Sequence, residues 1–256
     1  MSNKGTVAVN KSMGRKISTV NKIYNFINEY RGMEKLTINL NKEGAKNNDP
    51  FFHRMALSYY KHANGRSLRM PLVRNLEFGV ALVELPDDFN DYFMAVESSA
   101  RRNYKKSVRN EYSFSKFEYN DRLDDIWDIH RSAKFRQGAM PSELTDNRPS
   151  PINNGKSLTN LHDYLYYGVF DNNKLVAYLG VMLAGDLAMI GNIFGHADHQ
   201  SNGVVPRALI DGADHIIKNY PSVKYYGYGT YFGASDSLRR FKRKFHFTPK
   251  RVRWVY

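Results

Sequence analysis

The clearest pattern of hydrophobic and polar positions lies in the carboxy-terminal part of the chain. Apolar runs occupy residues 164–170, 174–184 and 187–194, and only the short polar or glycine segments 171–173 and 185–186 separate them. Apolar runs of this length joined by short turns are typical of neighbouring antiparallel strands. The pattern therefore predicts a meander of three strands in this region.

Helices and strands are predicted to alternate after the meander. The apolar spacing predicts a helix over residues 204–219 and a strand over residues 223–228. A second helix is expected over residues 235–245, with Ser235 or Asp236 as its capping residue, and the last ten residues are expected to form a closing strand. This order favours an α/β (α+β) fold in which a mixed sheet is flanked by helices.

The middle of the chain shows weaker but regular patterns. Residues 75–85 and 112–119 predict strands, and residues 87–110 predict a helix in two pieces. Residues 121–136 return to a helical spacing of apolar positions. Residues 137–160 are rich in Pro, Ser and Asn and show no period, so they predict a long loop of the kind that often borders a functional site.

The first 74 residues differ from the remainder because they carry no recognisable catalytic motif. A helix is expected over residues 16–30, and a second helix is expected to begin at Pro50 and to end at Asn64-Gly65. We therefore expect residues 1–74 to be an extension that packs on, or completes, a domain of residues 75–256.

Composition narrows the class of protein. The chain of 256 residues has no cysteine, which excludes disulfide frameworks, Cys-ligated zinc sites and thiol nucleophiles. No signal-peptide pattern opens the sequence, and the longest apolar stretch is interrupted at Gly185-Asp186. We therefore expect no membrane span and a cytoplasmic location. The sequence leaves the oligomeric state open.

Positive charge is the strongest compositional signal. The chain carries 38 Lys plus Arg against 25 Asp plus Glu, a formal charge of +13. Such an excess favours a polyanionic partner, such as a phosphate-rich cofactor, an acidic carrier protein or a nucleic acid. Part of the charge lies in two clusters, one in the middle of the chain and one near its carboxyl terminus. The clusters consist of Arg101, Arg102, Lys105, Lys106 and Arg109, and of Arg239, Arg240, Lys242, Arg243, Lys244, Lys250, Arg251 and Arg253.

Two features of the carboxy-terminal part resemble a known superfamily. The order of strands and helices from residue 164 onward resembles the acyl-CoA-binding half of the GNAT superfamily of acyltransferases. Residues 235–247 (SDSLRRFKRKFHF) resemble the last helix of that superfamily, with Phe241 and Phe247 at its two Phe positions. Lys242 stands where the superfamily often has a Tyr that protonates the departing thiolate, so that role does not carry over to this position.

The middle of the chain resembles one branch of the same superfamily. Residues 100–110 (ARRNYKKSVRN) followed by residues 112–130 resemble the Fem-type aminoacyltransferases, and N-acyl amino acid synthases are similar single-domain relatives. The resemblance implies a splayed central sheet whose gap holds an acyl donor, most simply acetyl-CoA or another acyl-CoA. Acyl carrier protein or aminoacyl-tRNA would use the positive surface more fully. The acceptor would be a small molecule, a glycan or a peptide.

The resemblance also implies where the donor binds. Its diphosphate would rest on backbone N–H groups where the strand ending near residue 194 leads through a loop into a helix, because unpaired N–H donors there favour anions. A backbone N–H near the end of the strand would polarise the thioester carbonyl. The residues expected to contact the donor are Asn192, Ile193, Phe194, Ser201, Asn202, Gly203, Val204, Val205, Ser235 and Lys242.

Candidate catalytic groups follow the same strand. His196 or His199 would be the general base, with Asp198 orienting it or binding the acceptor, and the alternative is that all three are polar loop residues. A pair of histidines without a third ligand is a weak metal signal, so no metal is expected. Tyr228 or Tyr231 would supply the general acid, although a packing role is favoured for any single tyrosine because the chain has 18 of them.

The sequence thus predicts an acyltransferase that moves an acetyl, longer acyl or aminoacyl group to an amine or hydroxyl acceptor by direct attack. The alternative is a nucleic-acid-binding or nucleic-acid-modifying protein that uses its basic surface on a GNAT scaffold. Binding that weakens steeply with salt would favour this alternative.

Overall fold

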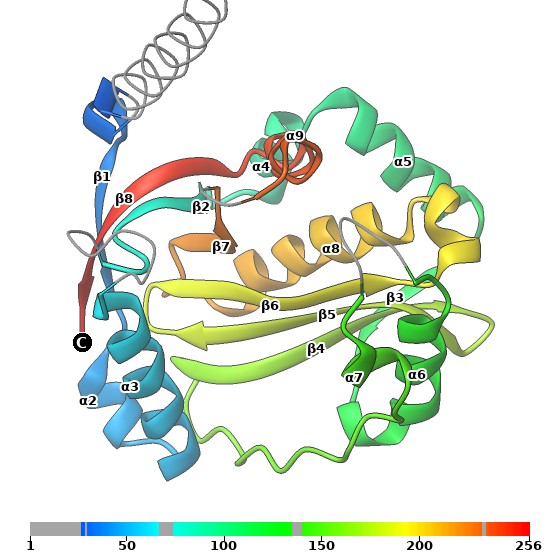
Figure 1. Cartoon of the computed structure of the whole chain (residues 1–256), viewed down its shortest axis with the longest axis horizontal. Helices are drawn as coiled ribbons and strands as arrows, with labels where there is room; N and C mark the ends of the chain where they lie inside the picture. The colour runs from blue at the N-terminus through cyan, green and yellow to red at the C-terminus, as the bar shows by residue number, and fades with distance from the viewer. Residues whose placement is uncertain (1–26, 29, 67–73, 135–139, 232–233) are drawn as a thin grey trace, which may run out of the picture.

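A computed structural model describes residues 27–28, 30–66, 74–134, 140–231 and 234–256. It shows one mixed sheet of eight strands with helices on both faces (Figure 1). The helix expected over residues 16–30 lies mostly outside the described residues. The expected α/β (α+β) class, a mixed sheet flanked by helices, is confirmed.

The strands are not arranged in their order along the chain. Neighbouring strands are antiparallel except for two parallel pairs, β1 with β8 and β6 with β7. From one edge to the other, the strands are β1 (Lys35–Asn39), β8 (Thr248–Val255), β2 (Phe78–Glu84), β7 (Tyr225–Thr230), β6 (Leu187–Gly195), β5 (Lys174–Ala184), β4 (His162–Asp171) and β3 (Ser113–Lys116).

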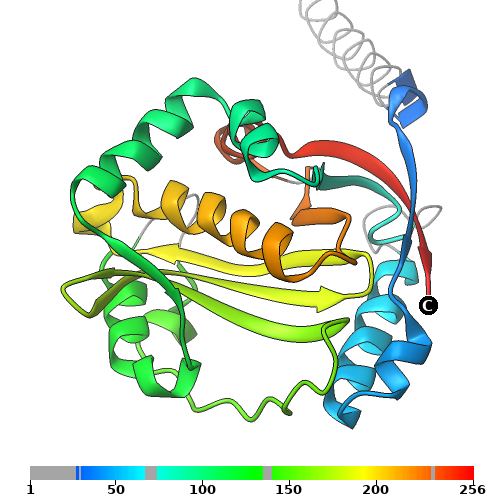
Figure 2. The same cartoon turned by 180° about the vertical axis from the view of Figure 1, so that it is seen from behind.

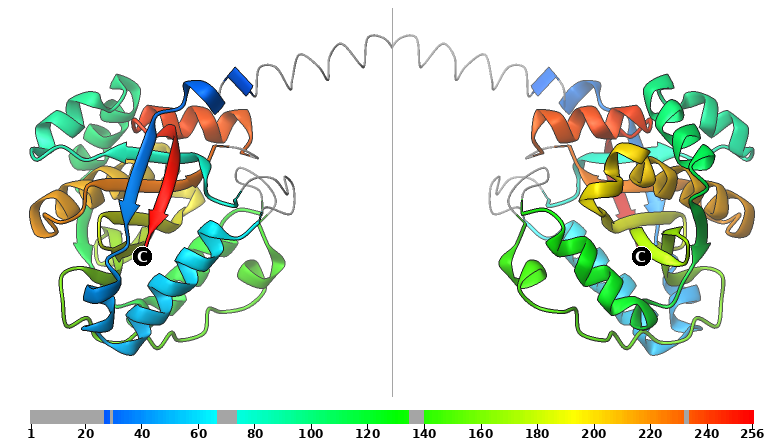
Figure 3. Two further views of the ribbon diagram at one scale, coloured as in Figure 1. Left: turned by 90° about the vertical axis from the view of Figure 1, so that its left-hand side faces the viewer. Right: turned by 90° about the vertical axis from the view of Figure 1, so that its right-hand side faces the viewer.

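Helices cover the two faces of the sheet unequally. On one face, α4 (Phe89–Ala95), α5 (Ser98–Arg109) and α8 (Val204–Asn219) share the largest apolar core with β4, β5 and β7 (Figure 2). The other face carries α3 (Pro50–Asn64) and α6 (Leu123–Arg131), each with a smaller apolar cluster (Figure 3). The remaining helical segments are α2 (Lys42–Lys46), η1 (Tyr119–Arg122), α7 (Ser142–Thr145), η2 (Ala197–Asn202) and α9 (Asp236–Lys244).

The sheet is splayed between β6 and β7. The two strands pair only from Leu187 to Met189, opposite Tyr225 to Gly227, although β6 continues to Gly195 and β7 to Thr230. Beyond Met189, β6 pairs with β5 alone. This splay is the feature that the resemblance implied, and it leaves one edge of β6 without a neighbouring strand.

Several predicted elements are shifted at their ends. The second predicted strand of the middle region shortens to β3, because η1 begins at Tyr119. Helix α6 ends at Arg131, before the predicted end, since the Ser132 hydroxyl donates to the Ile129 carbonyl and competes with the helical pattern. The segment predicted as an unbroken loop contains the short helix α7. Strand β7 begins two residues later than predicted and extends to Thr230.

Sequence patterns missed β1 and α2 because their local signals are short. Strand β1 has five residues, and its strand conformation depends on pairing with β8 at the far end of the chain. Ile38 of β1 is fully buried, in a cluster with Val252 and Trp254 of β8. Residues 35–39 therefore belong to the same sheet as the carboxy-terminal strands. In the part of the chain that the structure describes, no helix has the length and apolar character needed to cross a bilayer.

Candidate functional site

An exposed bulge marks the point where β6 leaves β7. The register between β5 and β6 shifts by one residue, so that Gly191 has no partner between Ile190 and Asn192. Residues 187–190 are buried, whereas Gly191 and Asn192 are exposed. A bulge re-aims the side chains that follow it and interrupts strand pairing. Gly191 and Asn192, the exposed residues of the splayed segment, are therefore accessible to a ligand.

The side chain of Tyr164 lies across three strands at this bulge. A Cβ atom on Gly191 of β6 would stand 2.6 Å from the Tyr164 hydroxyl oxygen, and a Cβ atom on Gly180 of β5 would stand 3.3 Å from it. The two glycines therefore provide the space in which the tyrosine lies. Burial raises the pKa of its hydroxyl, and the nearby side chain of Asn192 acts in the opposite direction.

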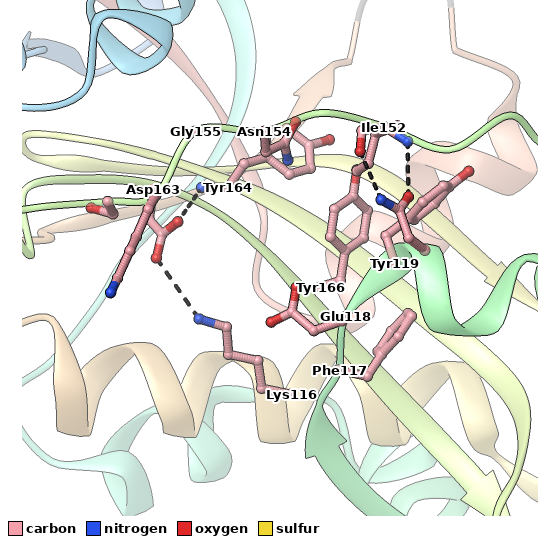
Figure 4. A pocket seen from close by; sticks show the side chains of 13 residues that line it. Lys116, Phe117, Glu118, Tyr119, Ile152, Asn154, Gly155, Asp163, Tyr164 and Tyr166 are labelled. Carbon is pink, nitrogen blue, oxygen red and sulfur yellow. Dashed lines mark hydrogen bonds and ion pairs between the residues drawn. The ribbon is translucent and has the colours of Figure 1, made fainter.

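A pocket of about 480 Å³ opens beside Tyr164 (Figure 4). It lies where β3 ends and leaves the edge of β4 uncovered, and a loop that follows α7 closes its rim. The Asn120 side chain holds this loop through two 2.8 Å hydrogen bonds, to the amide and the carbonyl of Ile152. The lining residues are Lys116, Phe117, Glu118, Tyr119, Asn120, Ile152, Asn154, Gly155, Lys156, Ser157, Asp163, Tyr164 and Tyr166.

The pocket combines aromatic walls with charges of both signs. The rings of Tyr119 and Tyr166 lie 4.8 Å apart, and those of Tyr164 and Tyr166 lie 5.1 Å apart. Asp163 forms an ion pair with Lys116 at 3.9 Å and accepts a hydrogen bond from the Tyr164 amide. Burial raises the pKa of Asp163, although Lys116 acts in the opposite direction. A pocket of this size and polarity suits a small polar molecule.

The predicted histidines form a second polar cluster beyond the end of β6. His196 Nε2 lies 3.6 Å from the Asp128 carboxylate, and His196 Nδ1 accepts a hydrogen bond from the Asp198 amide. Burial lowers the pKa of His196 more than the two carboxylates raise it. His199 Nδ1 is 2.7 Å from the Tyr112 hydroxyl, which also accepts a hydrogen bond from Asn202.

The histidine cluster and the bulge are separate places. His196 follows Asn192 by four positions, which corresponds to about 13 Å along an extended strand. Ile193 and Phe194 lie between them, and Phe194 packs against the rings of His130 and Tyr178. Among the described residues, no group of three or more His, Asp and Glu side chains is placed to hold a metal ion.

The turn that was expected to cradle a diphosphate is covered by α5. Gly203 adopts a left-handed conformation with φ of 79°, and a Cβ atom there would stand 2.0 Å from the Asn103 carbonyl oxygen of α5. Val204 is fully buried, and the Gly203 amide donates to the Gln200 carbonyl. Val205 is half-buried, and Ser201 is exposed. The Gly203 amide is thus already engaged by the Gln200 carbonyl, and α5 lies against this turn.

The predicted groups at the end of β7 form a third place. Tyr228 packs against Phe241 and Phe247, and the Tyr231 hydroxyl donates to the Phe247 carbonyl. Lys242 is 3% exposed, and its ammonium donates to the Thr230 carbonyl at 2.7 Å. Burial lowers the pKa of Lys242 to about 8.

Ser235 caps α9, because its hydroxyl accepts a hydrogen bond from the Leu238 amide. The expected sites thus occupy three places: the bulge, the histidine cluster and the end of β7.

Sequence reasoning missed Asp163, Tyr164, Tyr166 and Tyr112. The alternation of residues 164 and 166 with residues 165 and 167 places both tyrosines on one face of a strand, which was a usable signal. Their meeting with a glycine of another strand was not visible in the sequence.

The basic stripe on α5 is exposed to a large extent. Arg102, Lys105 and Arg109 are exposed, and within the described residues no ion pair joins the five cations of this helix to a carboxylate. Lys106 instead donates to the Ser201 carbonyl, and Arg101 lies over the Phe93 ring. The cations therefore remain available to an anionic partner.

Comparison with known proteins defines the class of fold. No protein-family model and no curated protein sequence matches the chain. Among solved structures, FemX is similar with a TM-score of 0.53 at 6% identity, over 77% of this chain and 66% of FemX. The chain thus has a GNAT-like fold of the Fem type, and the expected resemblance is confirmed at the level of the fold.

Two other solved structures are similar over smaller parts. The C-terminal domain of a proposed lysylphosphatidylglycerol synthetase from Agrobacterium fabrum has a TM-score of 0.43 and 15% identity, over 67% of this chain and 57% of that one. The ribosomal-protein-S18-alanine N-acetyltransferase from Escherichia coli has a TM-score of 0.30 and 21% identity, over 42% of this chain and 59% of that one. This chain therefore covers less than two thirds of the length of each of these structures.

Proposed function

We propose that the chain is an acyltransferase in which an activated acyl group enters the splay between β6 and β7 and an acceptor approaches from the pocket beside Tyr164. The observation that carries the proposal is the contact between these two features. Tyr164 lines the pocket, and its hydroxyl reaches the bulge at Gly191. An acceptor in the pocket would thus meet a donor carbonyl at the splayed edge of β6.

The splayed segment supplies groups suited to acyl transfer. The negative charge that develops on a carbonyl oxygen during attack is stabilised by N–H donors fixed in advance. Backbone amides of residues 192–194 lie on the strand that has lost its neighbour. We propose that one of them polarises the donor carbonyl, and that the Tyr164 hydroxyl, which lies beside Gly191, moves a proton at this point.

The pocket supports an acceptor that carries an amine. Asp163 and Glu118 are acidic, and Lys116 and Lys156 are basic, so the lining has two formal charges of each sign. Such a lining can bind an ammonium group and an anionic group of one molecule at the same time. We therefore propose an amino acid or a peptide-like amine as the acceptor, with Asp163 as a residue that binds it. The acceptor attacks as the neutral amine, so its ammonium form first gives one proton to water. As the acyl bond forms, the nitrogen loses a second proton, which the Tyr164 hydroxyl is proposed to relay to the leaving group.

The predicted histidines are assigned a less direct role. A general base must lie within hydrogen-bond reach of the proton that it removes, or be linked to it by one water. His196 is about 13 Å along the strand from Asn192. We propose that the residues past the end of β6 contact a part of the substrates that extends beyond that strand; they are His196, His199 and Asp198. We propose that a second group contacts the substrates at the end of β7; it consists of Tyr228, Tyr231 and Lys242.

A separate proposal concerns the carrier that holds the activated acyl group. Acetyl-CoA or another acyl-CoA is the simplest donor, but the Gly203 amide at the expected diphosphate site already donates to the Gln200 carbonyl. A donor carried by an acidic protein or by RNA could instead lie along the exposed cations of α5. The proposed donor class is therefore an activated acyl or aminoacyl group, and its carrier is a matter for direct measurement.

The test is a transfer assay with the full chain. Labelled acetyl-CoA, long-chain acyl-CoA, acyl carrier protein and aminoacyl-tRNA would be offered with a panel of amino acids and short peptides. We expect transfer from at least one donor. Tyr164→Phe should lower kcat by about 100-fold, the typical contribution of a proton-transfer group. Asp163→Asn should mainly raise KM for the acceptor, and Asp87→Asn, an exposed control, should change neither.

Three outcomes would contradict parts of this proposal. Absence of transfer from every donor would contradict the acyltransferase function. Normal kinetics of Tyr164→Phe and Asp163→Asn would remove the pocket from the mechanism. A loss of about 100-fold in kcat for His196→Ala or His199→Ala at saturating donor would make that histidine the general base and contradict the less direct role proposed for it.

Nucleic-acid binding is the second candidate function, because the cations of α5 have no carboxylate partners among the described residues. Contacts to phosphates weaken steeply as salt rises, with a slope set by the number of phosphates contacted. A salt titration of binding to a short RNA and a short DNA measures this slope. Arg102→Gln and Lys105→Gln should reduce it if α5 is the contact surface.

A further inference from the structure

A pocket of about 550 Å³ lies on the outer side of α9, away from the pocket beside Tyr164. It is formed by one face of α9, the beginning of β8 and the segment that precedes β1, and Figure 1 shows α9 beside the start of β8. Its lining residues are Gly32, Met33, Glu34, Tyr231, Arg239, Arg243, Thr248, Pro249 and Lys250.

Three cations from two elements line this pocket. Arg239 and Arg243 are four residues apart on α9, so their side chains project from the same face of the helix. Lys250 joins them from β8, and its side chain is only 15% exposed. Three cations against the single carboxylate of Glu34, which pairs with Lys250, leave an excess of two positive charges.

The two arginines retain donors for a ligand. The Arg239 Nε atom donates to the Ala234 carbonyl, and its other partner is Asp236, a fully exposed carboxylate at 4.0 Å. Arg243 has no ion pair or hydrogen bond through its side chain in the described part of the chain. Burial raises the pKa of the Tyr231 hydroxyl, and the nearby Arg243 acts in the opposite direction. Guanidinium groups bind phosphate oxygens through paired N–H donors.

The opposite side of the pocket is apolar. Met33, Pro249 and the buried ring of Tyr231 provide this surface, and the Tyr231 hydroxyl is already used by the Phe247 carbonyl. A ligand that matches both sides has a compact dianion at one end and a carbon framework at the other.

We propose that this pocket binds the dianion of an organic phosphate monoester. A phosphate monoester carries a charge close to −2 at neutral pH, which balances the excess of two positive charges. A phosphodiester carries only one negative charge and offers fewer free oxygens. The site therefore distinguishes a terminal phosphate from the backbone of a nucleic acid. The proposal does not depend on acyl transfer, because binding is measured without a donor.

The experiment is calorimetric titration of the full chain with phenyl phosphate at pH 7.5 and physiological salt, compared with methyl phenyl phosphate. We expect saturable binding of phenyl phosphate and binding of the diester at least about tenfold weaker, because a second charge-assisted contact is lost. Arg239→Gln and Arg243→Gln should each weaken binding by about tenfold. Arg240→Gln removes an exposed charge from the same helix outside the pocket and should change binding less than twofold.

The controls separate a built site from general surface charge. Thermal unfolding of each variant shows whether it folds, and the two pocket variants provide independent tests. Absence of saturable binding, equal binding of the monoester and the diester, or an equal loss in Arg240→Gln would each overturn the proposal. Competition by a short RNA without terminal phosphates would also overturn it, because it would indicate a surface that recognises the nucleic-acid backbone.

Discussion

Lys242 is a buried lysine whose charge opposes folding. Its side chain lies below Tyr228, with the ammonium 4.7 Å from the ring centroid, and donates to the Thr230 carbonyl. No carboxylate pairs with it among the described residues. Burial lowers its pKa from 10.5 to about 8. A difference of this size corresponds to about 3 kcal/mol in favour of the neutral amine in the folded protein.

This pKa makes the stability of the protein depend on pH. Below pH 8 the lysine is charged in both the folded and the unfolded chain, so the full cost of burying the charge is present. Between pH 8 and pH 10.5 the folded protein loses the proton while the unfolded chain keeps it, and the free energy of unfolding rises. The rise between pH 7 and pH 9.5 should be about 2 kcal/mol from this group.

Lys242→Met is the matching perturbation. The variant removes the buried charge and also the hydrogen bond from Lys242 to the Thr230 carbonyl, and a hydrogen bond that involves a charged group contributes about 1.5–3 kcal/mol. We expect its free energy of unfolding to be similar to, or about 1 kcal/mol above, that of the unmodified chain at pH 7. The free energy of unfolding of the variant minus that of the unmodified chain should be about 2 kcal/mol lower at pH 9.5 than at pH 7.

Urea unfolding at pH 7 and pH 9.5 measures this difference, with Lys244→Met as the control because that side chain of the same helix is not fully buried. A difference between Lys242→Met and the unmodified chain that stays the same at both pH values would refute the reasoning. Loss of transfer activity without loss of stability would further indicate that the buried lysine is retained for function.

Two further predictions test the bulge and the junction with the amino-terminal segment. Gly191→Ala would place a methyl group 2.6 Å from the Tyr164 hydroxyl oxygen, so urea unfolding should show a free energy of unfolding about 1–3 kcal/mol lower. Adding Tyr164→Phe should restore part of this loss, and no restoration would mean that the hydroxyl does not cause the clash. His162 is fully buried and donates through Nε2 to the Leu40 carbonyl, and burial lowers its pKa. The free energy of unfolding should therefore fall as the pH drops below about 6.5, because the unfolded chain takes up the proton there. His162→Gln should lose less stability between pH 7 and pH 5.5, and an equal loss would exclude His162 as the source.

Local patterns predicted the elements with self-contained signals. The meander of β4, β5 and β6 follows from apolar runs separated by short turns, and α3 follows from its caps, with the Asp49 side chain accepting from the Phe51 amide. Ser235 was one of two predicted caps of α9 for the same reason, and the structure shows that it is the cap. Each of these signals is complete within a few residues, so no distant contact is needed to interpret it.

The site was less accessible to sequence reasoning because it is assembled from distant segments. The resemblance correctly implied a splay, but the pairing of β6 with β7 that ends at Met189 is a property of the sheet. The covering of Gly203 by Asn103 joins residues one hundred positions apart. The contact of Tyr164 with Gly191 depends on two glycines in adjacent strands. None of these contacts leaves a periodic trace in the chain.

The sequence by itself determined the class of fold, the succession of strands and helices, and the large positive charge, because hydrophobic period, capping residues and composition are local properties. Only the tertiary structure decided which polar groups meet. Strand order placed the histidines, the bulge and Lys242 in three separate places, and it brought Asp163 and Tyr164 to the edge of a pocket. Pairing between distant strands sets these distances, and the spacing of residues along the chain does not encode them.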